Sequence, residues 1–426
     1  MKAIIAIDSF KGCLTSAEAG KAALKAFAEG EAEVIPVSDG GEGFSTIMTE
    51  SLGGSFRTVS CHDPLGRSVN ARYGIVGRTA IIETAAASGL GLLRKEELNP
   101  LLATSYGTGE LISDALEYGC EEIWLGLGGS ATCDGGTGML QALGYRFLPE
   151  DGGSVVYGNI PRRILKEDSS VYESISSDFG NIPRVILKNI YGMDSSSRSK
   201  LLDSCRITGF YDVSVPFCGP GGAARMFAPQ KGADPETVES LDGWLTMLCG
   251  VFSKYSGKDV LNIPGAGAAG GIGGALGGVL GASMVQGIQK VLDISRLDRK
   301  LDSCDIVITG EGWADAQTLR GKVPVGVLEY VRAHSVPENL PKVILVAGQV
   351  SDRQLLLDAG FDAVLQITPE GMPLSQALNP DTASANITKA ILSYLQSNTT
   401  GANYGHLHPK GPPKQVPGAE HDITHP

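Results

Sequence analysis

Histidine, paired cysteines and long apolar runs are all scarce in this sequence. Six histidines occur in 426 residues, and four of them lie in the segment 401–426. The folded part therefore keeps only His62 and His334, which makes Ser/His/Asp hydrolysis improbable. The eight cysteines are scattered singly without a CxxC pair, so neither the ligand spacing of a zinc site nor a disulfide framework is indicated. We expect a reduced, cytoplasmic protein.

Membrane segments and excess positive charge are also missing. No apolar stretch reaches the ~18 residues that a spanning helix needs, and no signal segment precedes the first strand. The formal net charge of −12 disfavours nucleic acid or an anionic membrane as a partner. The sequence predicts a globular protein with no nucleic-acid and no membrane partner, and a homo-oligomer is compatible with it.

Glycine is abundant and clustered. It fills 57 of 426 positions, about twice the usual share of ~7%, and gathers at 40–43, 126–138, 219–222 and 265–281. Such loops expose consecutive backbone N–H groups, which bind anions when a helix follows. No GxxxxGK[ST] loop occurs, and the GxGxxG string at 265–270 follows a poor strand, so a dinucleotide fingerprint is disfavoured. The segment 265–281 is either a tightly packed small-residue helix or a ligand-facing loop.

Two short polar motifs directly follow apolar strands. Asp8-Ser9-Phe10-Lys11-Gly12 comes after the strand predicted at 3–7, and Ser38-Asp39-Gly40-Gly41-Glu42-Gly43 comes after the apolar run 34–37. In open α/β sheets the ligand crevice lies just beyond the carboxyl ends of such strands. We expect both motifs to face an anionic ligand accompanied by a divalent cation.

The order of elements predicts an α/β fold with two α/β domains. Residues 1–62 have a β-α-β-α pattern, and residues 287–397 alternate strands at 305–309, 342–347 and 363–367 with helices. We expect these two segments to share one parallel sheet, giving a discontinuous Rossmann-like domain, with residues 63–286 inserted as the second domain. The active cleft would lie between the two.

Two segments are expected to be peripheral. A nine-residue block at 158–166 recurs at 180–188, which we interpret as a surface elaboration. Residues 398–426, including a tail rich in proline and glycine from 401, are expected to be disordered.

The residue types in these motifs indicate phosphoryl transfer. They supply Asp, Glu, Lys, Arg and backbone N–H groups, and no histidine. In such reactions carboxylates hold Mg²⁺ or accept the hydroxyl proton, while cations and amides neutralise the phosphates.

Six blocks in the chain resemble the bacterial glycerate kinase family of the glycerate 2-kinase type. The resemblance spans residue 1 to about 395 and rests on the blocks at 8–12, 38–43, 128–132, 222–233, 264–271 and 309–322. It implies a phosphotransferase that uses ATP and Mg²⁺ to phosphorylate D-glycerate, favouring 2-phosphoglycerate, in a fold of two α/β domains.

The candidate site residues follow from these blocks as hypotheses. Asp39, Lys11 and Asp212 are the candidate catalytic residues, with Asp39 as the first choice of base. Asp39, Glu42 and Asp212 are the candidate Mg²⁺ ligands. The candidate substrate- and phosphate-binding residues are Asp8, Ser9, Gly40, Gly41, Glu42, Ser130, Thr132, Arg225, Lys231, Glu311, Asp315 and Lys322.

Several of these residues have a structural alternative. Asp8, Glu311 and Asp315 could cap helices, and Ser130, Thr132 and Asp134 could cap the helix after Gly136. Three of the four cations, Lys11, Arg225 and Lys231, could each be a solvated or structural charge.

Four positions depart from the family's usual pattern. Cys133 stands in place of Asn, Ser214-Val215 in place of Asp-Asn, and Trp313 in place of Arg. These departures keep a second function class open, a non-catalytic sensor of hydroxy acids derived from a glycerate kinase. A third interpretation, a dehydrogenase that uses the glycines at 265–270, predicts NAD binding but lacks an evident acid for hydride transfer.

Overall fold

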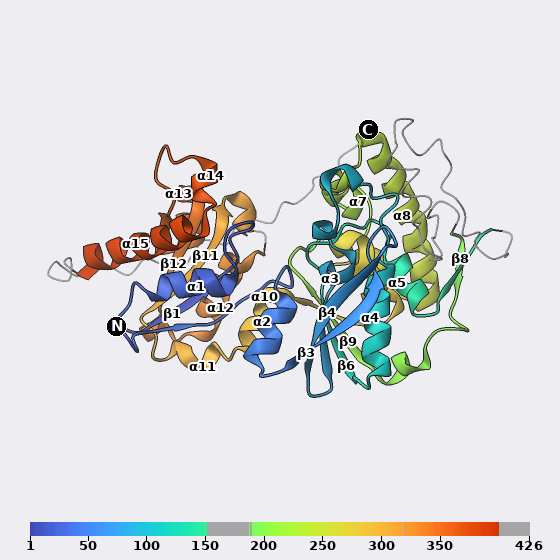
Figure 1. The fold of residues 1–426 in the computed structure, drawn as a ribbon, viewed down its shortest axis with the longest axis horizontal. Helices are drawn as coiled ribbons and strands as arrows, with labels where there is room; N and C mark the ends of the chain where they lie inside the picture. Colours follow the sequence, from blue (N-terminus) through green and yellow to red (C-terminus); the bar gives the residue numbers. More distant parts are fainter. Residues whose placement is uncertain (151–186, 188–189, 320, 400–426) are drawn as a thin grey trace, which may run out of the picture.

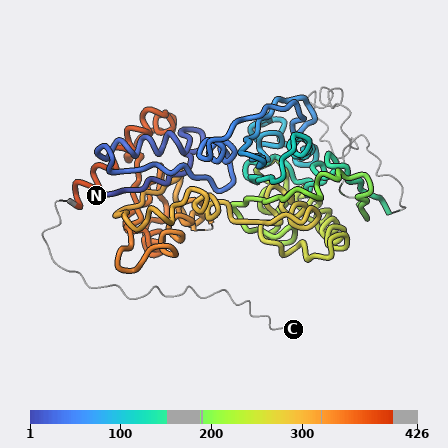
Figure 2. Tube along the Cα trace, turned by 90° about the horizontal axis from the view of Figure 1, so that it is seen from below, coloured from blue at the N-terminus to red at the C-terminus, as the bar shows by residue number. Residues whose placement is uncertain are grey.

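The computed structural model describes residues 1–150, 187, 190–319 and 321–399. The chain forms two lobes side by side, each built on its own β-sheet (Figure 1). One lobe combines the N-terminal residues with the C-terminal third, and the middle of the chain forms the other (Figure 2). The repeated block, apart from Leu187, and the 401–426 tail lie outside the described residues.

The first sheet is entirely parallel, with the strand order β13-β12-β11-β1-β2. Its strands are β1 (Ala3–Ile7), β2 (Ala32–Val34), β11 (Ile306–Ala314), β12 (Lys342–Val350) and β13 (Ala363–Gln366). β1 lies between β2 and β11, and Ala3 is in register with both Ala32 and Ile306. The two ends of the chain therefore share one sheet, as the sequence predicted.

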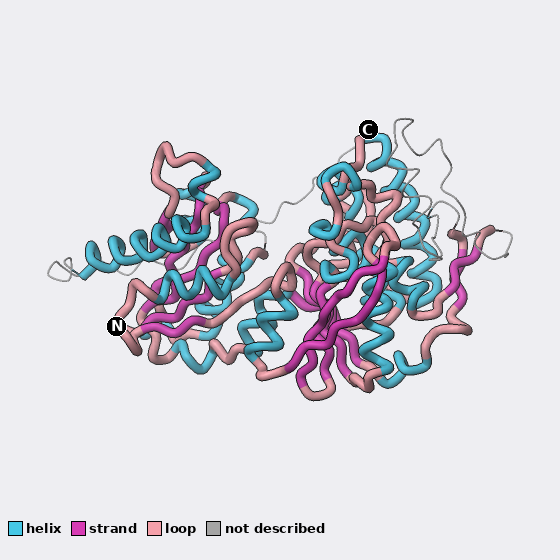
Figure 3. Tube along the Cα trace, in the orientation of Figure 1, coloured by secondary structure: helices cyan, strands magenta, loops and turns pink. Residues whose placement is uncertain are grey.

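Helices cover both faces of this sheet (Figure 3). Side chains alternate along β1, so Ile5 and Ile7 pack against α1 and α15 while Ile4 and Ala6 lie in the core on the α10 and α12 side. Each isoleucine that is fully buried in this way stabilises the fold by about 1.5–3 kcal/mol. The helices of this lobe are α1 (Ser16–Leu24), α10 (Gly287–Ile294), α11 (Asp298–Leu301), α12 (Val323–His334), α13 (Arg353–Ala359), α14 (Leu374–Ala377) and α15 (Pro380–Thr399).

The second sheet is mixed, with the strand order β10-β9-β6-β5-β4-β3. β10, β9, β6 and β5 run parallel, whereas β4 pairs antiparallel with β5 and with β3. Its strands are β3 (Ser55–His62), β4 (Ser68–Val76), β5 (Thr79–Glu83), β6 (Glu122–Gly126), β9 (Arg206–Tyr211) and β10 (Ser283–Gln286), and β7 (Arg146–Leu148) pairs separately with β8 (Gly192–Asp194). The helices of this lobe are α2 (Phe44–Ser51), α3 (Ala85–Ser88), α4 (Tyr106–Glu117), α5 (Thr137–Ala142), α7 (Ala223–Phe227), α8 (Pro235–Ser256) and α9 (Ile272–Gly274).

The division between the sheets falls earlier in the chain than residue 62. β3 pairs with β4 over its whole length, from Ser55 opposite Ile75 to His62 opposite Ser68. α2 packs on β4 and β5, and its Phe44 and Met48 are buried against Ile81 of β5. Residues 44–62 thus belong with the six-stranded sheet, because an alternating edge strand pairs most readily with the strand that follows it across a tight turn. We propose that the inserted domain begins near residue 44.

The glycine-rich segment 265–281 is tightly packed. It forms the 3₁₀ turn Ala268–Gly271, α9 and the π-helical turn Ala275–Val279, and its core positions are buried. A Cβ at Gly273 would lie 2.0 Å from the Gly265 carbonyl oxygen, and one at Gly274 would lie 2.2 Å from the Phe217 ring. No strand leads into Gly265 among the described elements, so this GxGxxG string lacks the setting of a dinucleotide loop. No described helix is both long and apolar enough to span a membrane.

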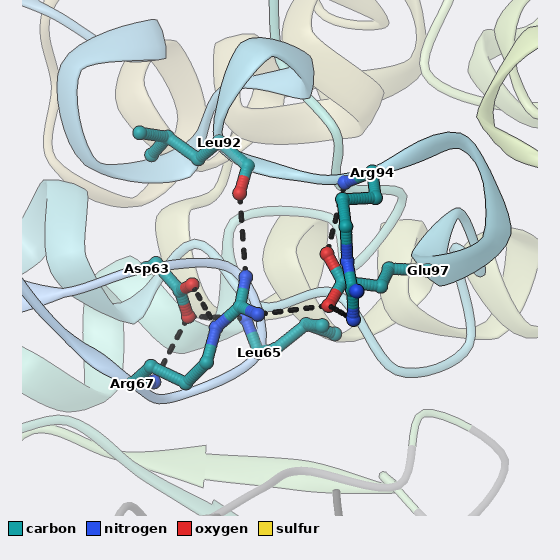
Figure 4. A network of polar contacts seen from close by, with 6 residues as sticks. All are labelled: Asp63, Leu65, Arg67, Leu92, Arg94 and Glu97. Atoms are coloured by element: carbon teal, nitrogen blue, oxygen red, sulfur yellow. Dashed lines mark hydrogen bonds and ion pairs between the residues drawn. The ribbon is translucent and has the colours of Figure 1, made fainter. Parts of the chain in front are cut away.

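A buried carboxylate ties the β3–β4 turn to the segment that follows α3. Glu97 accepts hydrogen bonds from Arg67 Nη1 (2.9 Å) and Arg94 Nη2 (2.8 Å), while Arg67 Nε also donates to Asp63 (2.6 Å) (Figure 4). The Glu97 side chain is 3% exposed. Its hydrogen bond from Arg94 is the main cause that lowers the Glu97 pKa to about 2.

This network predicts an acid-sensitive contribution to stability. The Glu97 pKa falls from 4.5 to about 2 on folding, which corresponds to roughly 3 kcal/mol. Because the folded-state pKa is lowered, the contribution is complete above pH ~4.5 and is lost as the pH falls toward 2. Glu97→Gln should lower the urea-derived free energy of unfolding at pH 7 by up to about 3 kcal/mol, and the difference from wild type should shrink below pH 4.5.

Glu121→Gln is the matched control for Glu97→Gln. The ion pair of Glu121 with Arg78 is exposed on both sides, so its loss should change the free energy of unfolding by less than ~1 kcal/mol. Equal losses in the two variants would contradict the assigned role of Glu97.

Candidate active site

The β1 end of the site is a tight turn that presents Asp8 and Lys11. The Asp8 backbone N–H donates to the Gly310 carbonyl of β11 (2.9 Å), which continues the strand pairing by one residue. Asp8 Oδ1 accepts the Ser9 N–H (2.7 Å), and the buried Phe10 anchors the turn. Lys11 is therefore held, exposed, at the carboxyl edge of the sheet.

The Asp39 loop is clamped between the two sheets. Asp39 Oδ1 accepts the Gly41 N–H (3.0 Å), and Gly40 has the left-handed φ of +96°. The Gly40 carbonyl accepts the Gly128 N–H (3.1 Å), and a Cβ on Gly40 would lie 2.7 Å from the Phe210 carbonyl oxygen. The loop thus lies on the carboxyl ends of β6 and β9, and only glycine fits at position 40.

Asp212 is a third carboxylate near the Asp39 loop, and it belongs to the lobe built on the six-stranded sheet. It directly follows β9, and its carbonyl oxygen lies near Gly321, which belongs to the loop between β11 and α12. Burial raises the pKa of Asp212 to about 6, and the charge of Asp39 adds to the rise. Residues from both lobes therefore meet at the Asp39 loop.

Electrostatics joins Asp8, Asp39 and Asp212 around Lys11. Burial raises the pKa of Asp8 well above its usual range, and the Asp39 charge raises it further. Burial also raises the pKa of Asp39, whereas the hydrogen bond from the Gly41 N–H and the charge of Lys11 lower it. Lys11 lowers the pKa of all three acids. We call Asp8, Lys11, Asp39 and Asp212 the carboxylate cluster.

Glu311 and Lys322 form a second pair beside this cluster. The buried Glu311 accepts hydrogen bonds from Thr318 Oγ1 (2.5 Å) and Lys322 Nζ (3.2 Å). Burial raises the Glu311 pKa, and the Glu311 charge contributes to the raised pKa of Asp8. The Lys322 charge lowers the pKa of Asp39. Both residues thus lie within electrostatic range of the cluster.

Asp315 has a local structural partner. Its Oδ1 accepts the Gln317 N–H (2.7 Å), and its own N–H donates to Thr318 Oγ1 (3.0 Å). These contacts close the short turn Ala316–Leu319, which is the capping alternative given for this residue.

The three candidate Mg²⁺ ligands are not brought together as one set. No group of three His, Cys, Asp or Glu side chains among the described residues has a geometry that could hold a metal ion. Glu42 is exposed, and its charge raises the pKa of Glu83. Asp39 and Asp212 do interact, and a pair of carboxylates still suits Mg²⁺, which typically takes one or two from the protein and the rest from phosphates and water.

Glu83 is a site-supporting residue that the sequence analysis missed. At the end of β5 it accepts the Gly43 N–H (3.3 Å) and the Ser45 N–H (2.6 Å), which begin α2. Its carboxylate fixes the C-terminal side of the Asp39 loop. A usable signal was present, because Glu83 ends an apolar strand just as Asp8 follows one.

Ser130 and Thr132 are buried in a loop that packs on the glycine-rich segment. Their hydroxyl oxygens lie 2.9 Å apart, and Ser130 Oγ donates to the Ala269 carbonyl (3.4 Å). Ala269 has a left-handed φ of 53°, which is uncommon for a residue with a Cβ. Asp134, two positions after Thr132, accepts hydrogen bonds from the Gly136 and Gly138 N–H groups, so it caps the start of α5.

Arg225 and Lys231 are engaged in protein contacts away from the carboxylate cluster. Arg225 on α7 donates to Glu239 and Asp242 of α8. Lys231 is 3% exposed, and its Nζ donates to the Thr132 carbonyl (2.7 Å). Burial lowers the Lys231 pKa. Both cations hold loops of the second lobe together.

The chain is similar to known proteins along nearly its whole length. Residues 3–396 match the glycerate kinase family. The chain belongs to the glycerate kinase family. It is 38% identical over 403 residues to the glycerate 2-kinase of Escherichia coli K12, covering 92% of this chain and 98% of that protein. It is 37% identical over 382 residues to a glycerate kinase of Halalkalibacterium halodurans, covering 88% and 93%.

The family fold is also shared with a solved structure. A crystal structure assigned to a glycerate kinase 2 of Salmonella typhimurium LT2 has a TM-score of 0.73 and 37% identity, covering 95% of this chain and all of that one. As a member of the glycerate kinase family, the chain is an enzyme that transfers a phosphoryl group, on the α/β fold that its sequence predicted.

Removing Lys11 should raise the acid pKa values in the metal-free protein. The ammonium favours the ionised form of Asp212, so Lys11→Met should move the Asp212 pKa above 6. A ¹³C NMR titration of the carboxyl carbons, assigned with Asp212→Asn, measures this shift. Lys21→Met, which removes an exposed lysine on α1, should leave it in place, and equal titration curves for Lys11→Met and wild type would contradict the cluster.

Gly40→Ala tests the clamp on the Asp39 loop. Gly30 is the matched control, because it has a similar φ of +79° with nothing within 4 Å of an added Cβ. Gly30→Ala should cost about 1–2 kcal/mol of unfolding free energy and leave phosphoryl transfer unchanged. Gly40→Ala should cost more and also lower kcat, because its Cβ overlaps Phe210 and displaces Asp39. Urea unfolding and steady-state kinetics measure both effects, and equal results for the two variants would contradict the close contact.

Proposed function

We propose that this enzyme transfers the γ-phosphoryl group of ATP to D-glycerate with Mg²⁺ and favours the 2-hydroxyl, giving 2-phosphoglycerate. The carboxylate cluster is the observation that carries the proposal. Three acids with raised pKa values lie around Lys11 at the carboxyl edge of a parallel sheet, where α/β proteins bind their ligands.

Asp39 is the proposed base. It must accept the proton of the attacking hydroxyl near the transition state, and a raised pKa makes its carboxylate a better acceptor than a solvated aspartate. The Gly41 N–H holds Oδ1, so the carboxylate is oriented before the substrate binds. Glu83 supports this geometry by fixing the N-terminus of α2.

Lys11 and Lys322 are the proposed anion-binding side chains. Both charges lower the pKa of Asp39, which supports a role for both cations beside the proposed base. One can hold the glycerate carboxylate and the other the transferred phosphoryl group. A cation bound to the carboxylate fixes the adjacent C2 hydroxyl more closely than the C3 hydroxyl, which favours the 2-phospho product.

Asp212, with Asp8 beside it, would hold Mg²⁺, and Asp39 would keep its carboxylate for the proton of the substrate hydroxyl. Bound there, the ion supplies positive charge that neutralises the phosphate oxygens. The mutual repulsion of these acids fits a cation, because a divalent charge relieves the cost of ionising neighbouring carboxylates. We assign no part in the proposed reaction to Ser130, Thr132, Arg225 and Lys231, because their hydrogen bonds hold loops of the second lobe together, and none to Glu42, because it is exposed.

The first experiment is ADP release from ATP and Mg²⁺ with and without D-glycerate, with ³¹P NMR of the product. Wild type should show glycerate-dependent turnover and a 2-phosphate signal. Asp39→Asn should lower kcat by at least ~100-fold, because it removes the base without changing size.

The control is Asp302→Asn, an exposed acid in the first lobe, which should keep full turnover. Glycerate binding by a folded wild-type protein without turnover would overturn the proposal in favour of the non-catalytic sensor. A 3-phosphate signal would contradict only the proposed preference for the 2-hydroxyl.

A further inference from the structure

An exposed tryptophan lies at the edge of the first sheet that carries Asp8 and Lys11. Trp313 is near the C-terminal end of β11, and it is 56% exposed. All three tryptophans of the chain lie within the described residues, and the other two, Trp124 of β6 and Trp244 of α8, are partly buried in the second lobe. Trp313 is thus the one tryptophan whose ring is open to a ligand.

The strand order makes the crevice between β1 and β11 the expected ligand site of this sheet. In the order β13-β12-β11-β1-β2, the chain continues from β1 to β2 on one side, whereas β11, β12 and β13 follow on the other. Ligands of open α/β sheets bind outside the carboxyl ends of the strands at such a switch point. Lys11 follows β1 and Trp313 lies near the end of β11, so these two residues belong to the two strands that flank the crevice.

Contacts of β11 connect Trp313 to both proposed anion-binding lysines. A Cβ on Gly312, the residue before Trp313, would lie 3.7 Å from the Lys11 backbone nitrogen. Glu311, two positions before Trp313, accepts a hydrogen bond from Lys322 Nζ (3.2 Å). The tryptophan therefore directly follows a strand segment that touches the β1 turn on one side and Lys322 on the other.

The loop after β12 holds the indole ring. Trp313 Nε1 donates to Ser351 Oγ (3.1 Å), and the Ser351 N–H donates to the Ala314 carbonyl (3.0 Å). Asp352 Oδ2 accepts the Ala316 N–H (3.1 Å), which ties the same loop to the end of β11. Because the polar atom of the indole is engaged with the protein, its flat apolar faces are what the ring offers to a ligand.

We propose that Trp313 stacks on the purine base of the nucleotide and sets a preference for ATP over pyrimidine nucleotides. This inference rests on the proposed use of ATP as the phosphoryl donor. Glycerate has a carboxylate and hydroxyl groups but no planar apolar group, so of the two substrates only the nucleotide can use an indole face. Aromatic side chains stack on every base, and the larger purine ring overlaps an indole more fully than a pyrimidine does.

The test measures the binding of ADP with Mg²⁺, which needs no turnover, by isothermal titration calorimetry and by tryptophan fluorescence. The double variant Trp124→Phe/Trp244→Phe leaves Trp313 as the single tryptophan. If that variant does not fold, the difference between wild type and Trp313→Phe reports the same signal. We expect ADP to change the Trp313 emission with the Kd that calorimetry gives, and inorganic tripolyphosphate, which lacks a base, to leave the emission unchanged.

Substitutions of Trp313 measure the stacking directly. Trp313→Ala should weaken ADP binding and raise the KM for ATP by about 5- to 100-fold, with kcat and the KM for glycerate close to wild type. Its kcat/KM for ATP relative to that for CTP should fall, whereas Trp313→Phe keeps an aromatic face and should lose less. Tyr118→Ala is the control, because Tyr118 is equally exposed (56%) but precedes β6 in the second lobe, and it should leave these values unchanged.

The outcomes separate this inference from the proposed function. If ADP binds wild type and Trp313→Ala equally, or binds without changing the Trp313 emission, the stacking role is overturned and ATP remains the proposed donor. If folded wild type binds neither ADP nor ATP, the proposed donor and the stacking role are overturned together.

Discussion

The burial of Asp8, Asp39 and Asp212 close to one another is the constraint on which this site depends. Backbone geometry fixes each carboxylate at the end of a different strand or loop; burial is the main cause that raises their pKa values, and repulsion from the Asp39 charge raises those of Asp8 and Asp212 further. Lys11 offsets part of this repulsion, and a divalent cation with phosphates would offset more. The fold thus holds in place a charge arrangement that becomes favourable only when ligands bind.

The glycines near the carboxylate cluster allow backbone segments to approach one another closely. Gly40 lies against the Phe210 carbonyl, Gly128 lies against Gly41, and a Cβ on Gly287 would lie 1.8 Å from the Asp39 carbonyl oxygen. The Asp39 loop is therefore enclosed by the ends of β6 and β9 and by the start of α10. The abundance of glycine in the sequence reflects how tightly the two lobes meet here, and the segment 265–281 uses glycine for the same reason within one lobe.

Cations of the second lobe show how packing decides the role of a charge. Arg225 and Lys231 stand in a block that resembles the family, next to a glycine-rich loop, and both were predicted to bind the substrate or the triphosphate. In the structure Arg225 pairs with two acids of α8, and Lys231 is buried against the Thr132 carbonyl. Their partners lie between 14 and 99 positions away along the chain, a separation that no local pattern reveals.

The sequence alone determined most strands of the parallel sheet, the sharing of that sheet by the chain's two ends, and the position of Asp8, Lys11 and Asp39 shortly after apolar runs. These features follow from local apolar runs and from the polar residues directly after them. Only the tertiary structure decided that β3 pairs within the second sheet, that Glu83 holds the Asp39 loop, and that Lys231 is buried against the Thr132 carbonyl. The physical reason is that the apolar pattern of a strand consists of residues that are neighbours in the sequence. The partner of a charged side chain depends instead on which distant segments pack together.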